Sequence, residues 1–306
     1  MRPVARVLMC PPDHFELRYA INPWMQPDRV RIDRARAGRQ WRALCKVLAQ
    51  EAALELLKPS AGLPDLVFTA NAGLVFGRRV VPARFRHSER QGEEARVRGW
   101  FAAAGFELCE LPEGLVFEGA GDALFEHEGR RLWLGCGPRS DARVAPALAK
   151  LLGIDVEPLR LVDPRFYHLD TCFCPLPRGG LLWFPAAFDS ESRLRVEAAF
   201  APDRRISVVE AEAVRFACNA VCLGERVIGD GIGDATEARL AHLGFDVERV
   251  QLDEFQKSGG SAKCLVLRLD CPPCAAPPAA AQSRAASQSR APSAARRPLA
   301  KQAVSR

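Results

Sequence analysis

The sequence of 306 residues predicts an α/β protein in which five similar units close into a ring, a five-fold pseudo-symmetric α/β propeller. The first observation is a repeat: five segments contain a cluster of small or polar residues, then Asn, Asp or Cys, then a short apolar run. The intervals between the key residues are 51, 48, 49 and 45. A fixed period of this length is typical of repeat architectures. The key residues are Asn71, Asp122, Asp170, Asn219 and Cys264.

The second observation is that each repeat contains both strand and helix patterns. After Asp122, two apolar runs with Gly129 between them predict a β-hairpin. A helix pattern follows, with Ser140 or Asp141 as the expected capping residue and Gly153 at its end. The unit therefore reads as strand, strand, helix, strand. Three helices are expected to end in the same way, at Gly105, Gly153 and Gly244.

The first unit is expected to run from Val4 through a helix in which Trp41, Leu44 and Leu48 share one face. Five such units favour a closed ring, because each one then buries its apolar face on its neighbours and few strand edges are exposed. The five key residues would converge on the axis. A kelch propeller has a similar period, but its blades contain only strands, which disagrees with the helical stretches here.

The composition predicts one folded domain, residues 1–270, and a disordered, basic tail rich in Ala, Pro, Ser and Arg over residues 271–306. The net charge is +6, and the tail alone contains six basic residues and no acidic residue after position 274. Because the rest of the chain is balanced in charge, we expect it to bind neither nucleic acid nor membrane.

The N-terminal apolar stretch is too short and too rich in proline for a signal peptide, and no apolar run approaches the about 20 residues of a membrane span. Eleven cysteines, an odd number spread along the chain, do not resemble a secreted disulfide framework. We therefore expect a cytoplasmic protein with reduced thiols. The sequence leaves a homo-oligomer open.

Two axial segments carry the residue types of nucleophilic catalysis. Cys264 follows a loop of small residues, and Lys257 and Lys263 nearby are able to lower the pKa of its thiol. His168 and Asp170 are two positions apart on an expected strand, so their side chains point the same way. A histidine beside a carboxylate suits proton transfer in a cysteine-based reaction, although such a pair is also common as a purely structural contact.

Carboxylates surround this expected nucleophile. Glu118 and Asp122 bracket the glycine-rich Gly119–Gly121 segment, and Asp170 adds a third. Burying three carboxylates requires a compensating cation, so either the site is wet or its ligand is cationic. A divalent metal is the competing explanation, but Cys264 is a poor ligand for Mg²⁺ or Ca²⁺, and zinc favours more His and Cys. We expect no metal.

The remaining cysteine pairs favour a structural role. Cys271 with Cys274, and Cys218 with Cys222, each lack a second matched pair for zinc, while Cys172 and Cys174 are expected to pack along one strand. No glycine-rich phosphate loop follows a strand, so no nucleotide cofactor is indicated.

The motifs, taken in order, resemble those of the guanidino-group modifying enzymes, whose fold is called the pentein fold. The resemblance covers about residues 4–269 and is nearest to arginine dihydrolases. It is less close to arginine deiminases, dimethylarginine dimethylaminohydrolases and amidinotransferases. It rests on the segments MCPPDHF, INPWM, FTANAGLVF, SERQGEE, FEGAGD, FYHLDTCF, CNAV and SGGSAKC.

The resemblance implies roles for the axial residues. Cys264 would attack the guanidinium carbon, His168 would serve as general acid and then base, and no metal or organic cofactor would be needed. Glu118, Asp122 and Asp170 would hold the planar cation. By motif position, Arg90 and Arg139 are candidates for the substrate carboxylate, and Asn22 is a further polar contact.

Asn71 stands where deiminases and dimethylarginine hydrolases typically have an acid, as it does in arginine dihydrolases. In that family the asparagine is linked to a second attack, on the ureido group, which takes arginine to ornithine, ammonia and CO₂. The alternatives are a deiminase or dimethylarginine hydrolase that stops at citrulline, an amidinotransferase, and a propeller that only binds a cationic amino acid.

Overall fold

Five three-stranded sheets make up the computed structural model, which describes residues 5–126 and 129–270. In each sheet the middle strand pairs antiparallel with one neighbour and parallel with the other. In the second sheet, Leu74 of β3 (Gly73–Phe76) faces Val81 of β4 (Arg79–Pro82), and Val80 faces Leu108 of β5 (Glu107–Leu108). A helix connects the middle strand to the parallel strand. The predicted unit of strand, strand, helix, strand is therefore confirmed.

The other sheets repeat this plan. Their strands are β15 (Leu267–Arg268), β1 (Ala5–Met9) and β2 (Ala52–Leu56); β6 (Ala123–Phe125), β7 (Arg131–Cys136) and β8 (Asp155–Arg160); β9 (Phe173–Leu176), β10 (Gly180–Trp183) and β11 (Arg205–Ser207); β12 (Val221–Leu223), β13 (Arg226–Gly229) and β14 (Asp246–Arg249). The connecting helices are α1 (Arg34–Leu48), α2 (Ser88–Ala103), α3 (Val144–Leu152), α4 (Ser190–Ala199) and α6 (Asp234–His242), and the short helices are α5 (Glu210–Ala213) and α7 (Asp253–Gln256).

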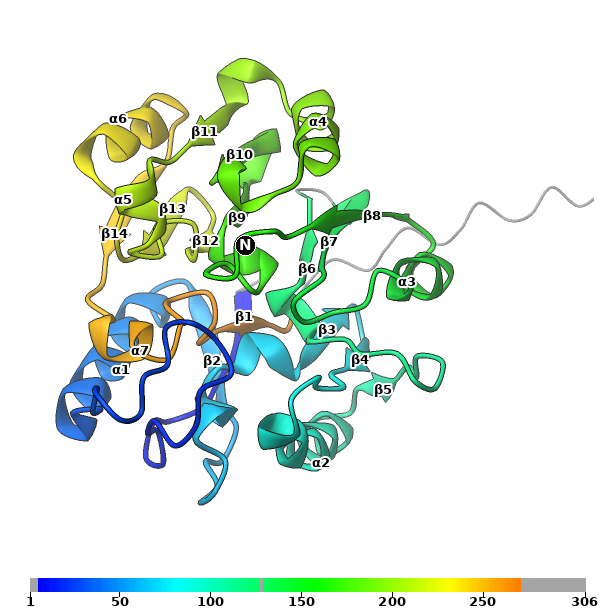
Figure 1. Cartoon of the computed structure of the whole chain (residues 1–306), viewed down its shortest axis with the longest axis vertical. Coiled ribbons are helices and arrows are strands. Elements are labelled where there is room, and N and C mark those ends of the chain that lie inside the picture. The colour runs from blue at the N-terminus through cyan, green and yellow to red at the C-terminus, as the bar shows by residue number, and fades with distance from the viewer. Residues whose placement is uncertain (1–4, 127–128, 271–306) are drawn as a thin grey trace, which may run out of the picture. The chain divides into compact units, whose positions relative to one another are not determined.

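The sheets surround a common centre, and the five connecting helices lie outside them (Figure 1). The apolar core lies mainly between neighbouring units. One buried cluster joins the first and second units, another the second and third, a third spans the third to fifth units, and the last joins the fifth to the first. Trp133 and Trp183 are among its largest fully buried side chains. Each unit therefore depends on its neighbours for burial.

The ring is closed by the two ends of the described chain. The first sheet takes β15, its antiparallel strand, from the far end of the sequence, with Leu267 opposite Leu8. The sequence predicted that the first unit begins at Val4 and is continuous in the chain. The structure shows instead that one of its three strands comes from the C-terminal end of the described residues. The hydroxyl of Thr69 lies 2.9 Å from the carbonyl oxygens of both Leu8 and Leu265, so it ties the second unit to both segments of this closure.

The helices end at the glycines that the sequence predicted, but one helix does not begin at the predicted capping residue. Gly105, Gly153 and Gly244 have φ of 79°, 70° and 81°, the left-handed region that favours glycine. The predicted cap of α3 by Ser140 or Asp141 is wrong, because α3 begins at Val144 without a side-chain cap. Ser140 instead donates its hydroxyl hydrogen to Asp122, at 2.6 Å.

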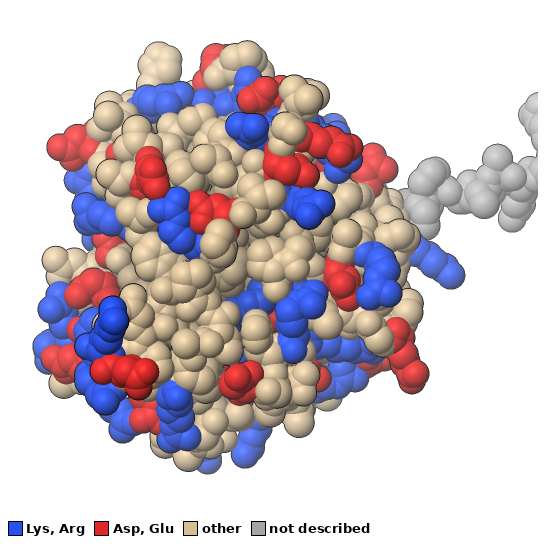
Figure 2. Space-filling view, viewed as in Figure 1, with Lys and Arg blue, Asp and Glu red and all other residues tan. Residues whose placement is uncertain are grey.

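Basic and acidic side chains are interspersed on the face shown in Figure 2. Within the described ranges, no helix combines the length and apolar character needed to cross a bilayer. The predicted tail, residues 271–306, lies outside the described residues, and so does the cysteine pair within it.

Replacing Thr69 with valine tests the closure. The change keeps the shape of the side chain but removes the donor to two buried carbonyl groups. We expect the free energy of unfolding to fall by about 1–3 kcal/mol, measured by urea denaturation. An unchanged midpoint and slope would show that the closure does not depend on this hydroxyl.

Candidate active site

The axial residues of the repeats lie together. Asn219 connects two of the others, since its Nδ2 donates to the carbonyl of Asp170 (3.0 Å) and to Cys264 Sγ (3.1 Å). Its Oδ1 accepts a hydrogen bond from the Cys264 backbone N–H (3.2 Å). Asn71 and Asp122 lie at the neighbouring turn Gly119–Gly121, where Asn71 Nδ2 is 3.4 Å from the carbonyl oxygen of Glu118. The repeat period therefore brings distant segments to one centre.

The Cys264 thiol is buried beside Asp170, with 3.5 and 3.6 Å between Sγ and the two carboxylate oxygens. Burial, followed by the Asp170 charge, raises the pKa of Cys264 well above its ordinary value. Asn219 and the Lys263 ammonium act in the opposite direction. The isolated site therefore holds a protonated thiol, and a cation placed beside it would favour the thiolate.

His168 is held by Glu118, with 2.7 Å between Nε2 and Oε2. Glu118 also pairs with Arg139 (3.0 Å) and accepts a hydrogen bond from the backbone N–H of Arg86 (3.1 Å). Burial alone would raise the pKa of Glu118, but Arg139 and His168 outweigh it and hold this pKa well below the usual range. Glu118 is therefore ionised and fixes the imidazole by one nitrogen.

A small, narrow cavity opens beside Cys264. Five residues singled out from the sequence line it, and others were not foreseen. The lining residues are Ile21, Asn22, Met25, Asp65, Phe68, Asn71, Arg90, Arg139, Tyr167, Ser258 and Cys264.

Both arginines of this cavity already have protein partners. Arg90 donates to Glu93 through Nε and Nη2 (2.9 and 2.8 Å), to Asn71 Oδ1 (2.8 Å) and to the carbonyl of Asp65 (3.2 Å). Arg139 donates to Glu118 and to the carbonyl of Ile21 (2.8 Å). Since a guanidinium has five N–H donors, Arg139 keeps three for a ligand and Arg90 keeps one.

Two of the predicted carboxylates have different surroundings from those expected. Asp122 is outside the cavity lining, and its oxygens accept hydrogen bonds from Ser140 and from the backbone N–H of Leu169 (3.1 Å). Glu118, His168 and Asp170 are likewise outside the lining. Asp122 supports the turn that follows His168, and its contact with a ligand stays a prediction. Asp170 touches the thiol of Cys264. Burial raises the pKa of each aspartate to about 6.

Sequence reasoning missed Asp65 and Glu93. Asp65 is a buried carboxylate in the cavity wall, 3.0 Å from the hydroxyl of Tyr19, and burial raises its pKa. Glu93 is equally buried against Arg90. Asp65 lies in the apolar segment LPDLVF, where an acidic residue is itself a signal. Glu93 lies in a charged helix pattern and gave none.

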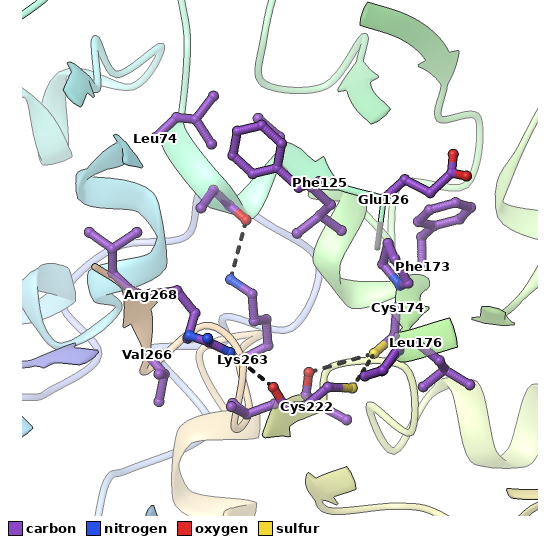
Figure 3. Close-up of a pocket in the computed structure, with 18 of the residues that line it drawn as sticks. Leu74, Phe125, Glu126, Phe173, Cys174, Leu176, Cys222, Lys263, Val266 and Arg268 are labelled. Atoms are coloured by element: carbon purple, nitrogen blue, oxygen red, sulfur yellow. Dashed lines mark hydrogen bonds between the residues drawn. The ribbon is translucent and has the colours of Figure 1, made fainter. Parts of the chain in front are cut away.

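The two lysines near Cys264 differ in position. Lys257 pairs with Glu254 (2.6 Å) and is not among the main influences on the pKa of the thiol. Lys263 extends into a second, larger cavity, where its Nζ is 3.4 Å from the carbonyl oxygen of Ala120 (Figure 3). Inner strands of all five sheets line this cavity, mostly with apolar side chains and without a histidine. It is therefore the poorer candidate for nucleophilic chemistry.

Across residues 5–126 and 129–270, no three His, Cys, Asp or Glu side chains are grouped so that they could hold a metal ion. Cys174 and Cys222 approach to 3.7 Å between their sulfur atoms.

Fold and site define a class of protein: an α/β propeller with a cysteine, a histidine and paired carboxylates at its axis. The sequence matches the family described as N,N-dimethylarginine dimethylhydrolase, eukaryotic, over residues 11–270. The chain belongs to this family of pentein-fold proteins.

Two curated relatives differ in length and name. The bifunctional arginine dihydrolase/ornithine cyclodeaminase AgrE of Nostoc is 52% identical over 267 residues, which are 87% of this chain and 38% of AgrE. The N(G),N(G)-dimethylarginine dimethylaminohydrolase of Mycobacterium tuberculosis is 38% identical over 268 residues, 86% of this chain and 85% of that protein. The chain thus spans well under half the length of its bifunctional relative.

Solved structures agree in fold. The N-terminal domain of ArgZ, an arginine dihydrolase from cyanobacteria, was crystallised as a cysteine-to-serine variant bound to substrate. It is 50% identical, with a TM-score of 0.86 over 88% of this chain and 99% of that one. A dimethylarginine dimethylaminohydrolase at 22% identity and a TM-score of 0.71 supports the fold alone.

Replacing Gly121 with alanine tests how tightly the axis is packed. A Cβ at this position would lie 2.2 Å from Asn71 Nδ2 and 3.5 Å from His168 Cγ. We expect the free energy of unfolding to fall by about 1–3 kcal/mol, measured by denaturation. Gly99→Ala is the control, because nothing lies within 4 Å of a Cβ there. Equal stability of the two variants would contradict the packing.

Replacing Asp170 with asparagine tests the electrostatics of Cys264. Removing the negative charge lowers the pKa of the thiol, so alkylation by iodoacetamide at pH 7 becomes faster, by about tenfold per unit of pKa. The difference from the parent grows as pH rises through about 6, where Asp170 ionises.

Peptide mass spectrometry measures the rate at Cys264, with Cys45 as the internal reference, because Cys45 has no contact with Asp170 and burial raises its pKa to about 12. A slower or unchanged rate at Cys264 would contradict this account.

Proposed function

We propose that this protein is an arginine dihydrolase, which hydrolyses the guanidino group of arginine through a covalent adduct on Cys264. Arginine, two molecules of water and no cofactor would give ornithine, two molecules of ammonia and CO₂. The observation that carries the proposal is Asn71, a neutral amide in the wall of the cavity that contains Cys264. The 52% identity to AgrE supports the same substrate.

The guanidinium end of the substrate belongs beside Cys264. Glu118 is ionised nearby, and Asp170 ionises near pH 6, so the site favours a cation at neutral pH. A guanidinium placed there offsets the Asp170 charge and lowers the pKa of the thiol. Substrate binding would thus generate the nucleophile.

The amino-acid end would be bound by other polar side chains that line the cavity. Arg139 has three N–H donors left for the α-carboxylate, and it is fixed over the Tyr167 ring at 4.6 Å from the ring centroid. The buried carboxylate of Asp65 suits the α-ammonium. Asn22 is held by the carbonyl of Ser258 (3.0 Å) and adds a polar contact. Arg90 contributes one donor at most.

In the first half of the reaction, the Cys264 thiol gives its proton to His168, and Sγ forms a bond to the guanidinium carbon. The carbon–nitrogen bond of a terminal NH₂ breaks, and His168 gives that nitrogen a proton, so ammonia leaves. The product is an S-alkylthiouronium. His168 then takes one proton from water, whose oxygen bonds to the same carbon. The carbon–sulfur bond breaks, and the second proton of the water goes to the sulfur, which gives bound citrulline and the free thiol.

In the second half, Cys264 attacks the neutral ureido carbon of citrulline. Asn71 Nδ2 can donate a hydrogen bond to the ureido oxygen, which a carboxylate cannot do. Loss of the second ammonia leaves a thiocarbamate, and its hydrolysis gives a carbamate that separates into ornithine and CO₂. The alternative is that the enzyme releases citrulline, made either from arginine or from dimethylarginine. The family match makes a dimethylarginine hydrolase the second candidate function.

We also propose that residues 1–270 form the complete catalytic domain. Every residue given a role above lies within them, and β15 closes the ring before residue 270.

Incubation of the purified protein with arginine labelled in the guanidino carbon tests the proposal. We expect ornithine, labelled CO₂ and about two ammonia per arginine, followed by mass spectrometry, and no turnover in Cys264→Ala. In Asn71→Asp, ornithine formation should fall by about tenfold or more, because a donor to the ureido oxygen is lost, and citrulline should accumulate.

If Asn71→Asp produced ornithine at the parental rate, the proposed hydrogen bond from Asn71 to the ureido oxygen would be wrong. Citrulline as the only product of the parent would make the protein a deiminase, and turnover of dimethylarginine alone would favour the second candidate.

A further inference from the structure

The side chain of Arg90 is a buried connector between helix α2 and the axis. Arg90 and Glu93 are three residues apart on α2, and both are almost completely buried. Glu93 receives two parallel hydrogen bonds from Arg90, through Nε (2.9 Å) and Nη2 (2.8 Å). A third hydrogen bond runs from Arg90 Nη1 to Asn71 Oδ1, at 2.8 Å. The helix thus reaches Asn71 through a rigid, bidentate pair.

This contact decides which way the Asn71 amide faces. An asparagine side chain can rotate so that its oxygen and nitrogen exchange places, but a guanidinium only donates hydrogen bonds. Arg90 therefore selects the orientation with Oδ1 toward itself. Nδ2 is left on the side of Gly121 and His168, where a Cβ on Gly121 would meet it at 2.2 Å. One N–H of Nδ2 is directed to the carbonyl oxygen of Glu118 (3.4 Å), and the other remains for the ureido oxygen of a substrate in the cavity that Asn71 lines.

Glu93 holds Arg90 in this position. A buried guanidinium without a paired carboxylate is strongly unfavourable, so it moves toward whatever charge or water is available. The nearest alternative is Asp65, whose carbonyl, not its carboxylate, now accepts from Arg90. Without the Glu93 charge, Arg90 is free to turn toward the Asp65 carboxylate and release Asn71.

We propose that Glu93 is a positioning residue: acting through Arg90, it fixes the Asn71 amide with its donor toward the substrate, and so sets the ratio of ornithine to citrulline. The inference rests on the proposed arginine dihydrolase function. It assigns Glu93 no contact with the substrate. Its signature is therefore a change in product identity at a given amount of arginine consumed.

Glu93→Gln tests the proposal, with Glu254→Gln as a matched control. Glu254 is as buried as Glu93 and also pairs with a basic residue three positions away, Lys257, but it lies on α7 and does not contact Asn71. Labelled arginine is supplied to each variant, and citrulline and ornithine are quantified over time. We expect the ornithine-to-citrulline ratio to fall by about tenfold in Glu93→Gln, the factor for losing one charge-assisted hydrogen bond, and to stay at the parental value in Glu254→Gln.

An unchanged ratio in Glu93→Gln, even with slower turnover, would overturn the proposal, because a purely structural role lowers the rate without changing the product. The same fall in Glu254→Gln would also overturn it. If Glu93→Gln does not fold, Glu93→Asp takes its place, since it keeps the charge but shortens the side chain, and a reduced ratio is again expected. A parent that makes no ornithine would refute the proposed function instead.

Discussion

The ion pair between Arg139 and Glu118, buried at the centre of the ring, is the interaction on which the site depends. Glu118 is fully buried, and Arg139 and His168 are the main groups that keep it ionised. The same pair orients His168 and places a guanidinium in the cavity wall. A second buried pair, Arg90 with Glu93, supports Asn71 in a similar way. The cavity is therefore lined by arginines that are already neutralised, and it can receive a cationic substrate without repulsion.

The ring makes this concentration of charge possible. Each buried ion pair forms within one unit, and the five inner turns that meet at one axis bring these pairs beside groups of other units, such as His168 of the fourth unit against Glu118 of the third. Glu118 and Arg139 belong to the third unit, Arg90 and Asn71 to the second, and Cys264 to the last segment of the chain. Closure by β15 beside β1 is therefore required for the site as well as for the core.

Much of this architecture could be predicted from the period of the sequence, because Asn71, Asp122, Asp170, Asn219 and Cys264 recur at similar intervals and the glycine exits repeat with the helices. Orientation could not be predicted in the same way. Asp122 occupies an axial position, yet it turns to Ser140, because the backbone of Leu169 and the hydroxyl of Ser140 both need an acceptor there. Glu93 and Asp65 were missed because their partners are distant in the sequence or hidden in an ordinary helical charge pattern.

The central claim is that Cys264 forms a covalent bond with the carbon of the guanidino group. Rapid acid quenching during turnover of labelled arginine, followed by peptide mass mapping, tests this most directly. The account predicts a peptide containing Cys264 that carries the mass of arginine less one ammonia, with the label retained. Turnover accompanied by an adduct on a different residue, with Cys264 unmodified, would contradict it.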